Sequence, residues 1–267
     1  VFQMEIHPKK KKYYKYDQEW RKFEISSAKL KVKLNNGWVI PVRKKILWSE
    51  YGPVVKNDSG VFSFHLSALE NISAIDQWFQ MNKAKNFEDF KKALKIMGIP
   101  RFNIVYADKE DNIFYMSNAL IPLRDSIYDW SATLPGNTSK TNTNGYYSFS
   151  DLPKLENPAS GYIFNTNNSP FNCTQKEDNL KEETFHKSLG YREKFNNRSL
   201  RFEKLISSYD KINYQDFVTI KYDQEYANPI YCPFKINKIF EVSFNNITDI
   251  TDILNIIQNW DRKANVN

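Results

Sequence analysis

The chain has 267 residues, enough to bury a sizeable core as one large domain or two small ones. Its 41% hydrophobic and 15% aromatic residues are typical of a globular protein and exclude a disordered one. No apolar run approaches the roughly 20 residues of a membrane-spanning helix, and no signal peptide opens the chain, so we expect no membrane span. The chain starts at Val1 inside a predicted strand, and we therefore expect a piece of a longer protein.

The first quarter of the chain is predicted to be mostly antiparallel sheet. Four segments alternate polar and apolar residues and are rich in β-branched and aromatic types, namely residues 1–7, 20–34, 37–48 and 52–55. Between the second and the third lies Asn35-Asn36-Gly37, a sequence typical of a hairpin turn.

A basic run follows the first of these strands. Residues 9–16 are five lysines and three tyrosines, and the formal net charge of the chain is +7. A basic and aromatic surface can hold phosphates and stack bases. Elsewhere, however, acidic residues are interleaved with the basic ones, so we interpret the run as a solvated loop between two strands and predict no nucleic-acid partner.

The middle of the chain is predicted to alternate helices and strands. Apolar residues between Ile75 and Asn82 lie at helical spacing, and a second helix begins after the cap residue Asn86. The predicted apolar face of this second helix consists of Phe87, Phe90, Leu94 and Met97. Residues 102–107 and 113–117 then read as two strands around a loop rich in turn-forming residues.

The second half is predicted to contain a long connection and three helices. Residues 131–160 are rich in Ser, Thr, Asn, Gly and Pro, and we expect a long surface connection there. Helical patterns follow at residues 199–207, 214–222 and 247–260. Sheets and helices in separate runs predict an α+β fold.

A cluster of three asparagines stands at the end of an apolar run in residues 161–170. A short strand over residues 162–164 would deliver these carboxamides to its own end, where Pro170 removes a backbone donor and stops the strand. Asparagine is a poor strand former and costly to bury, so this strand end suits a fixed amide donor in a site. The alternative is that the asparagines form an Asx turn.

Cysteine and histidine point to no metal centre. The chain has two cysteines, Cys173 and Cys232, which exclude a metal cluster of cysteines and either pair in an oxidising compartment or are unrelated thiols. The three histidines are scattered and have no second ligand type at metal spacing. We therefore predict neither a metalloenzyme nor a histidine-based triad.

Seven short motifs occur in one order along almost the whole chain. They are YDQEW at 16–20, SEYGPVV at 49–55, NKAKNF at 82–87, NIVYAD at 103–108 with NIFY at 112–115, NPASGYI at 157–163, RSLR at 198–201 and NWD at 259–261. In this order they resemble the β chain of the penicillin acylase family of N-terminal nucleophile hydrolases. Residues 185–205 look more like the branch of the acyl-homoserine-lactone and aculeacin acylases.

The resemblance implies an amide hydrolase that contains the four-layer αββα sandwich with additional helices and is made as a self-cleaving precursor. In that family the second chain begins with a serine that attacks the amide carbonyl, and its own α-amine is the base. An α-amine titrates near pH 8, so it can accept the hydroxyl proton at neutral pH. This chain begins with Val1 instead. We therefore expect both ends to be truncated relative to the family and the chain to be inactive alone.

The resemblance also implies roles for individual residues. Asn167 matches the position whose carboxamide donates to the tetrahedral oxyanion, and Asn168 is its rival because a slip of one residue would exchange them. Arg198 matches the family's site arginine at the head of a helix, where it helps to hold the catalytic asparagine. Without the resemblance, Arg198 would be interpreted as a surface arginine at the start of an amphipathic helix.

Two further residues match family positions. Phe102 matches a residue that lines the acyl pocket, where an apolar wall suits an apolar acyl group, and its alternative is a plain core residue of a strand. Asp178 lies where some members place a calcium-binding carboxylate, but the other ligands would come from missing segments, so we assign no metal ligand here. We expect no required cofactor, and calcium only as an option in the intact protein.

The implied partners are a small N-acyl amide substrate, such as a β-lactam side chain or an acyl-homoserine lactone, and the α chain of the processed precursor. The implied location is the periplasm or outside the cell. Within the chain, residues 1–195 are expected to form the sheet-rich part and residues 196–267 a helical segment. The alternative function is a non-catalytic module that binds an anionic polymer through the basic, aromatic loop.

Overall fold

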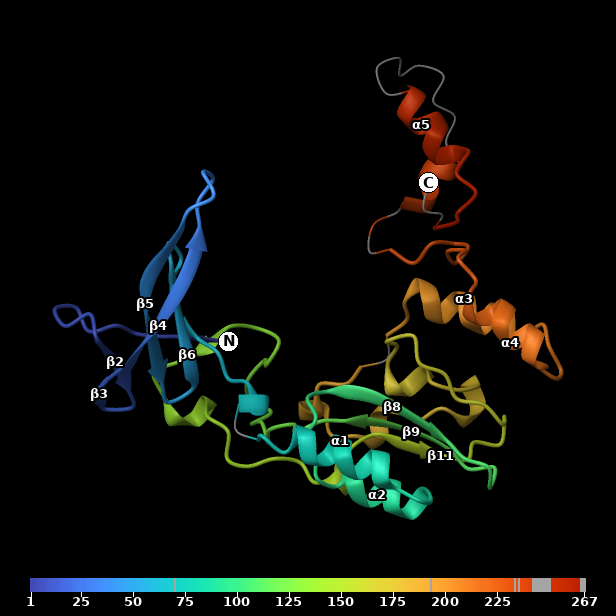
Figure 1. The fold of residues 1–267 in the computed structure, drawn as a ribbon, viewed down its shortest axis with the longest axis horizontal. Helices are drawn as coiled ribbons and strands as arrows, with labels where there is room; N and C mark the ends of the chain where they lie inside the picture. Colours follow the sequence, from blue (N-terminus) through green and yellow to red (C-terminus); the bar gives the residue numbers. More distant parts are fainter. Residues whose placement is uncertain (70, 193, 233, 235, 242–250, 265–267) are drawn as a thin grey trace. The chain divides into compact units, whose positions relative to one another are not determined.

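The structure is a computed structural model, and it describes residues 1–69, 71–192, 194–232, 234, 236–241 and 251–264 (Figure 1). The chain divides into two compact units that alternate along the sequence. Unit 1 comprises Val1–Ile104, Met116–Pro153 and Glu183–Tyr191, and unit 2 comprises Val105–Tyr115, Lys154–Glu182 and Arg192–Asn267. Among the residues described, no helix has both the length and the apolar character needed to cross a membrane.

A six-stranded sheet in unit 1 has the strand order β10-β1-β7-β6-β5-β4. Its strands are β1 (Phe2–Gln3), β4 (Glu24–Lys33), β5 (Val39–Ser49), β6 (Gly52–Asn57), β7 (Gly60–Ser63) and β10 (Leu134–Pro135). Neighbouring strands are antiparallel except β1 and β10, which run parallel. The predicted turn Asn35-Asn36-Gly37 lies between β4 and β5, where Gly37 has a φ of +88° that a residue with a side chain rarely adopts.

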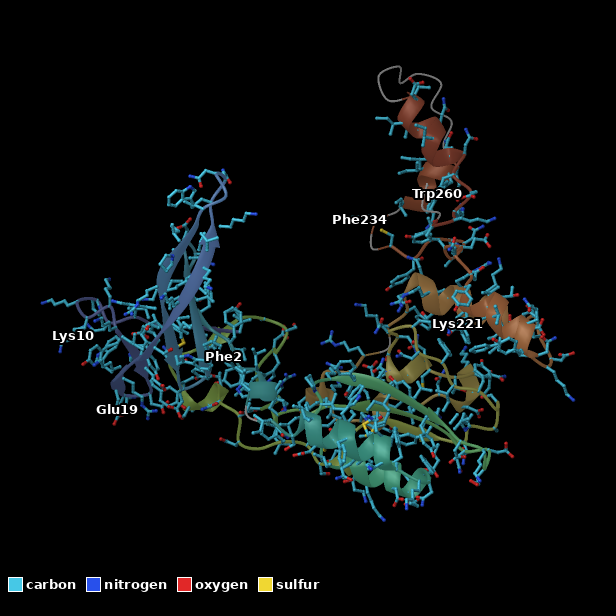
Figure 2. All side chains as sticks on the ribbon, viewed as in Figure 1. Phe2, Lys10, Glu19, Lys221, Phe234 and Trp260 are labelled. Atoms are coloured by element: carbon cyan, nitrogen blue, oxygen red, sulfur yellow. The ribbon has the colours of Figure 1, made fainter. Side chains whose placement is uncertain are left out.

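The basic run is half loop and half strand. Residues 9–12 form the loop, which carries Lys10 (Figure 2), but β2 (Tyr13–Tyr16) pairs antiparallel with β3 (Glu19–Lys22). Tyr14 and Tyr16 are only 3% and 6% exposed. The prediction of a solvated loop over residues 9–16 was therefore wrong in its second half, because two tyrosines at strand spacing face the core there.

The core of unit 1 joins this ribbon to the six-stranded sheet. Phe2 stacks on Tyr51 with ring centroids 4.2 Å apart, and Tyr14 stacks on Phe23 at 4.7 Å. Buried aromatic side chains dominate the energetics of such a core because each removes a large apolar area from water. The buried members of this cluster are Phe2, Met4, Tyr14, Tyr16, Phe23, Tyr51 and Leu134.

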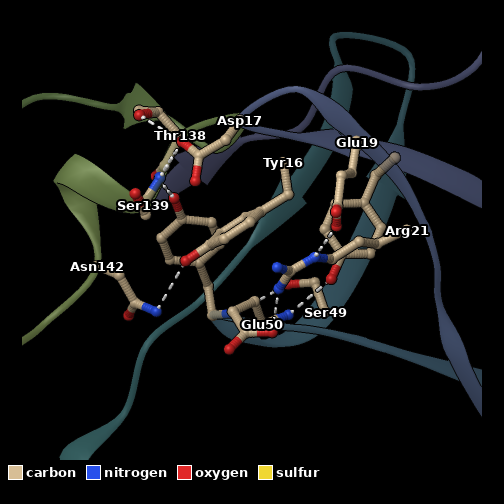
Figure 3. Close-up of polar contacts among 11 residues, drawn as sticks. Tyr16, Asp17, Glu19, Arg21, Ser49, Glu50, Thr138, Ser139 and Asn142 are labelled. Atoms are coloured by element: carbon tan, nitrogen blue, oxygen red, sulfur yellow. Dashed lines mark hydrogen bonds and ion pairs between the residues drawn. The ribbon is translucent and has the colours of Figure 1, made fainter.

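Polar contacts fix the segment after residue 131 against the same core (Figure 3). Asp17 accepts hydrogen bonds from the backbone N–H of Ser139 at 2.9 Å and from the hydroxyl of Thr138 at 3.2 Å. Asn142 donates to the hydroxyl of Tyr16 at 3.3 Å. The segment predicted as a long surface connection over residues 131–160 is mostly exposed or half-buried, but it also contributes short strands to two sheets, and long-range partners order it.

Helices α1 (Ala74–Lys83) and α2 (Phe87–Leu94) confirm the two predicted helices. The side chain of Asn86 accepts a hydrogen bond from the backbone N–H of Asp89 at 2.9 Å and caps α2 as predicted. In α1 the fully buried residue is Gln77, which donates to Asn118 at 2.8 Å and accepts from the backbone N–H of Ile99 at 2.9 Å. A polar side chain, rather than the apolar stripe, therefore anchors α1.

A three-stranded sheet has the order β11-β9-β8. Its strands are β8 (Phe102–Ala107), β9 (Ile113–Asn118) and β11 (Lys154–Glu156), so both strands predicted here are confirmed. In the loop between β8 and β9, the carboxylate of Asp108 accepts hydrogen bonds from the backbone N–H groups of Glu110 and Asn112. Because these hydrogen bonds join near neighbours, the turn-forming residues of the loop predict it from the sequence.

The later helices are α3 (Asn197–Ile206), α4 (Tyr214–Lys221) and α5 (Thr251–Gln258), and they confirm the last three helical predictions apart from residues 247–250, which lie outside the described residues. Short 3₁₀ turns are η1 (Ser67–Leu69), η2 (Ser139–Thr141), η3 (Phe149–Asp151), η4 (Pro170–Asn172), η5 (Lys176–Asp178), η6 (Glu182–Thr184), η7 (Lys187–Leu189) and η8 (Ile236–Phe240). The chain thus has the expected α+β composition. The proposed division between residues 195 and 196 stays a prediction.

Candidate active site

The asparagine cluster lies on a turn in unit 2 and does not end a strand. Residues 162–164 are not a strand, and they bond instead to the segment beyond Pro170, with the N–H of Phe164 donating to the carbonyl of Cys173 at 2.9 Å. Pro170 begins η4 instead of terminating a strand. The strand prediction was wrong because nearby asparagine side chains offer the backbone a local alternative to a β-ladder.

The Asx-turn interpretation is confirmed. The backbone N–H of Asn167 donates to the side-chain oxygen of Asn165 at 2.9 Å, and Asn167 has a φ of +61°. Asparagine tolerates this left-handed conformation better than most residues because its side chain bonds locally. The turn leaves the side chain of Asn167 on the surface, so an Asx turn and a donor role are compatible.

The two rival asparagines have different surroundings. Asn168 is 5% exposed, and its amide donates to the carbonyl of Asn172 at 2.6 Å. Its side-chain oxygen accepts from both the backbone N–H and the hydroxyl of Thr166, at 2.6 and 3.0 Å. The carboxamide of Asn168 therefore holds the turn together. Of the two, only Asn167 presents its carboxamide at the surface.

Arg198 fixes the orientation of the Asn167 carboxamide. It is the second residue of α3, and its Nη2 donates to Oδ1 of Asn167 at 2.8 Å. A guanidinium has only donors, so it must face the oxygen of the amide, and the amide nitrogen is turned away from it. No hydrogen bond joins Nδ2 of Asn167 to another described residue. The pair thus presents an oriented neutral N–H donor.

The start of α3 is itself tied to the asparagine turn. The side chain of Asn196 accepts from the backbone N–H of Ser199 at 2.9 Å as the N-cap, and its amide donates to the carbonyl of Thr166 at 3.1 Å. One residue therefore satisfies an orphan N–H of the helix and fastens the helix to the turn. This anchoring sets where Arg198 stands relative to Asn167.

One turn further along α3 is an ion cluster that the sequence did not reveal. Arg201 donates to both carboxylate oxygens of Asp223, at 2.9 and 2.7 Å, and its Nη2 lies 2.5 Å from Glu225. The bonds from Arg201 hold the pKa of Asp223 below its ordinary value. Arg201 belongs to the RSLR motif, but nothing in local spacing pairs it with a carboxylate 22 residues away.

A cavity of about 1030 Å³ lies beside this turn within unit 2. Residues 162–166 form one wall, and the apolar side chains of α3 and α4 form much of the rest. The ring of Phe164 stacks on that of Phe202 at 4.3 Å, which closes part of the gap between the turn and α3. Arg198 and the Arg201 cluster also line the cavity, so it combines an apolar wall with charged groups.

The proposed acyl-pocket residue is partly exposed. Phe102, the first residue of β8, belongs to unit 1 and is 50% exposed, so it is not the plain core residue of the alternative interpretation.

The carboxylate of Asp178 accepts a hydrogen bond from the backbone N–H of Ser160 at 2.6 Å. Among the described residues, no group of three or more His, Cys, Asp or Glu side chains is arranged to hold a metal. Cys173 and Cys232 are free thiols, and burial raises the pKa of Cys173 to about 12.

Comparisons with known proteins define the class of the fold. A thermostable penicillin G acylase from Alcaligenes faecalis has a similar structure, with a TM-score of 0.70 and 22% identity over 98% of this chain and 45% of that one. The chain therefore has the N-terminal nucleophile hydrolase fold of the penicillin acylases, as expected.

Sequence comparison then gives the family. Residues 1–267 match the model of the penicillin amidase family, and the chain belongs to that family. Penicillin G acylase of Escherichia coli is 28% identical over 179 residues, or 64% of this chain and 20% of that protein. Acyl-homoserine lactone acylase PvdQ of Pseudomonas fluorescens (strain Pf0-1) is 26% identical over 130 residues, or 46% of this chain and 17% of that protein. The chain thus spans about a fifth of the length of these relatives, and they give no support to an anionic-polymer module.

Proposed function

We propose that the protein to which this chain belongs hydrolyses the amide bond of N-acyl substrates, and that this chain supplies the oxyanion donor, Asn167. The observation that carries the proposal is the hydrogen bond from Arg198 to Asn167, which turns the amide N–H₂ outward as an oriented donor. Family membership supports an amide hydrolase as the class of enzyme. The substrate and the residue roles are our inference.

The mechanism follows from where negative charge develops. A serine hydroxyl at the start of the catalytic chain attacks the amide carbonyl, and the serine's α-amine takes the hydroxyl proton. The carbonyl oxygen becomes an oxyanion, to which Asn167 donates a hydrogen bond. A fixed donor of this kind is worth about 3 kcal/mol in the transition state. Collapse of the intermediate breaks the C–N bond, and the α-ammonium gives the proton to the departing amine. The acyl group stays on the serine as an ester until water, deprotonated by the same α-amine, attacks it and releases the carboxylic acid and the free serine hydroxyl.

Arg198 acts as a positioning residue in this scheme. Its guanidinium contacts the oxygen of Asn167, so it directs the amide nitrogen without donating to the substrate. Preorganised donors cost no reorganisation at the moment of reaction, and this explains why the amide is held before substrate arrives.

The proposal also covers the acyl pocket, the kind of substrate, the partner chain and the cellular location. Phe102 is proposed to line the acyl pocket, and its half-exposed ring suits contact with an apolar group. The names of the relatives, a penicillin G acylase and an acyl-homoserine lactone acylase, support an N-acylated substrate of one of these kinds. A processed α chain as partner, a periplasmic or exported location, and calcium in the intact protein belong to the same proposal.

The test is turnover by the intact processed protein against N-acyl amides of increasing chain length, with release of the amine as the readout. We expect saturable hydrolysis of at least one member, lost when the nucleophilic serine is replaced. The 267-residue chain alone is expected to be inactive. Absence of turnover across the panel by correctly processed protein would contradict the proposal.

A further inference from the structure

Two arginines share a second cavity, which lies within unit 1. This cavity has a volume of about 230 Å³, and Arg101 and Arg124 both line it. His65, Ser67, Asn71 and the backbone around Gly98 contribute further polar groups to the lining. The proposed hydrolysis uses none of these residues.

Both guanidiniums lie over aromatic rings. Arg101 lies over the ring of Tyr191 at 4.2 Å, and Arg124 lies over Trp130 at 5.4 Å. In the part of the chain that the structure describes, neither arginine forms an ion pair with a carboxylate. Asp125 is the neighbour of Arg124 in sequence, but its carboxylate accepts from the backbone N–H of Ile127 at 3.0 Å.

Arg124 has an unused donor inside the protein. Its Nε is buried and has no hydrogen-bond partner among the described residues. A buried donor without a partner is destabilising, because it has lost its hydrogen bond to water and gained none in the protein. The pKa of Arg124 is also lowered, by burial and by the positive charge of Arg101, so the two cations repel each other across this region. A negative charge between them would relieve both costs.

We propose that this cavity binds a small oxyanion, a carboxylate or a phosphate, between the guanidiniums of Arg101 and Arg124. Arginine presents its donors in a planar fork that matches either anion. Hydrogen bonds from a guanidinium to such an anion are stronger than hydrogen bonds between two neutral groups. A cavity of about 230 Å³ is large enough for acetate or phosphate. The site is independent of the proposed amide hydrolysis.

The experiment is isothermal titration calorimetry of the intact protein that contains this chain, at constant ionic strength, first with inorganic phosphate and then with acetate. We expect saturable binding of one anion per chain by at least one of the two probes. Arg124→Gln should weaken that binding by about 10-fold or more because it removes a charge-assisted donor. Arg101→Gln should weaken it comparably, and this exposed residue can be changed with little effect on folding.

The matched control is Arg43→Gln, which removes the same charge from an exposed position on β5 outside the cavity. We expect this variant to bind within about twofold of the unmodified chain, because exposed charges act weakly at a distance in salt. Binding of phosphate alone, acetate alone or both would support the site and identify its anion. No saturable binding of either probe, or an equal loss in Arg43→Gln and Arg101→Gln, would overturn the proposal. If Arg124→Gln does not fold, the Arg101→Gln result decides.

Discussion

Two arginines one turn apart on α3 have opposite kinds of partner. Arg198, in the first turn, donates to the neutral amide of Asn167 at the surface. Arg201, in the next turn, is held by the carboxylates of Asp223 and Glu225, and its side chain is 16% exposed. Because its donors are bound by two carboxylates, Arg201 has a structural role. An arginine that orients a neutral donor leaves that donor available for chemistry.

The same contrast separates the two neighbouring asparagines. The oxygen and the nitrogen of the Asn168 carboxamide both form hydrogen bonds within the turn. The oxygen of Asn167 accepts a hydrogen bond from Arg198 instead, and its nitrogen is turned outward. Substitutions can therefore separate function from stability at adjacent positions.

Asn167→Ala should lower the kcat of the intact protein by about 10²-fold or more, because the oxyanion loses its donor. The free energy of unfolding should fall by only about 1 kcal/mol, because the side chain is exposed but alanine tolerates the φ of +61° less well than asparagine does. Steady-state kinetics and chemical denaturation of the same preparation measure both. Near-normal turnover would contradict the proposed role of Asn167 as the oxyanion donor.

Asn168→Ala should lower the free energy of unfolding more than it lowers kcat. Removing the buried carboxamide leaves the N–H of Thr166 and the carbonyl of Asn172 without their partner, so we expect a loss of about 2 kcal/mol in the free energy of unfolding. Denaturant titration of the variant measures it, with Asn167→Ala as the matched control. A stable Asn168→Ala protein with strongly reduced kcat would exchange the roles of the two residues.

Asp223→Asn should destabilise the protein by about 1.5 kcal/mol at pH 7, because Arg201 loses a partly buried ionic partner. The pKa of Asp223 is held below its usual value near 4, so its contribution is present above that pH and lost as the pH falls through the lower folded-state pKa. The difference in stability between variant and parent should therefore shrink on acidification below about pH 4. A difference that stays constant with pH down to pH 2 would contradict the ion-pair account.

Arg198→Lys should give the smallest effect, a decrease of about fivefold in kcat with unchanged stability. Lysine keeps the charge but lacks the planar fork that fixes the amide oxygen, so Asn167 would be oriented less well. Single-turnover kinetics at saturating substrate would measure this step directly. An unchanged rate would show that the guanidinium geometry is unimportant.

Local signals explain which parts of the fold the sequence could predict. The strands β8 and β9, the turn at Asn35-Asn36-Gly37 and the cap at Asn86 all depend on bonds between near neighbours, and all are confirmed. The second half of the basic run was predicted incorrectly although its partner strand β3 is local, because the lysines around Tyr14 and Tyr16 hide the fact that these two rings face the core. The order in the segment after residue 131 was not predicted, because it depends on residues more than 100 positions away, as in the pair of Asp17 and Ser139.

The candidate site shows the same limit. The sequence placed Asn167 and Arg198 through family resemblance alone, 31 positions apart, and the hydrogen bond between them is the feature that local patterns could not supply. The Arg201 cluster was missed because arginines and carboxylates are common on helix surfaces and carry no signal of which will pair. The different burial and bonding of Asn167 and Asn168 could not be predicted either, because the two are identical neighbours in one short turn.

The most direct test of the central claim is a double-mutant cycle on kcat with Asn167→Ala, Arg198→Ala and the double variant of the intact protein. If Arg198 works by orienting Asn167, its substitution should cost nothing further once Asn167 is gone, so the double variant should match Asn167→Ala within about twofold. Losses that multiply would contradict the account, because Arg198 would then act on the reaction independently of Asn167.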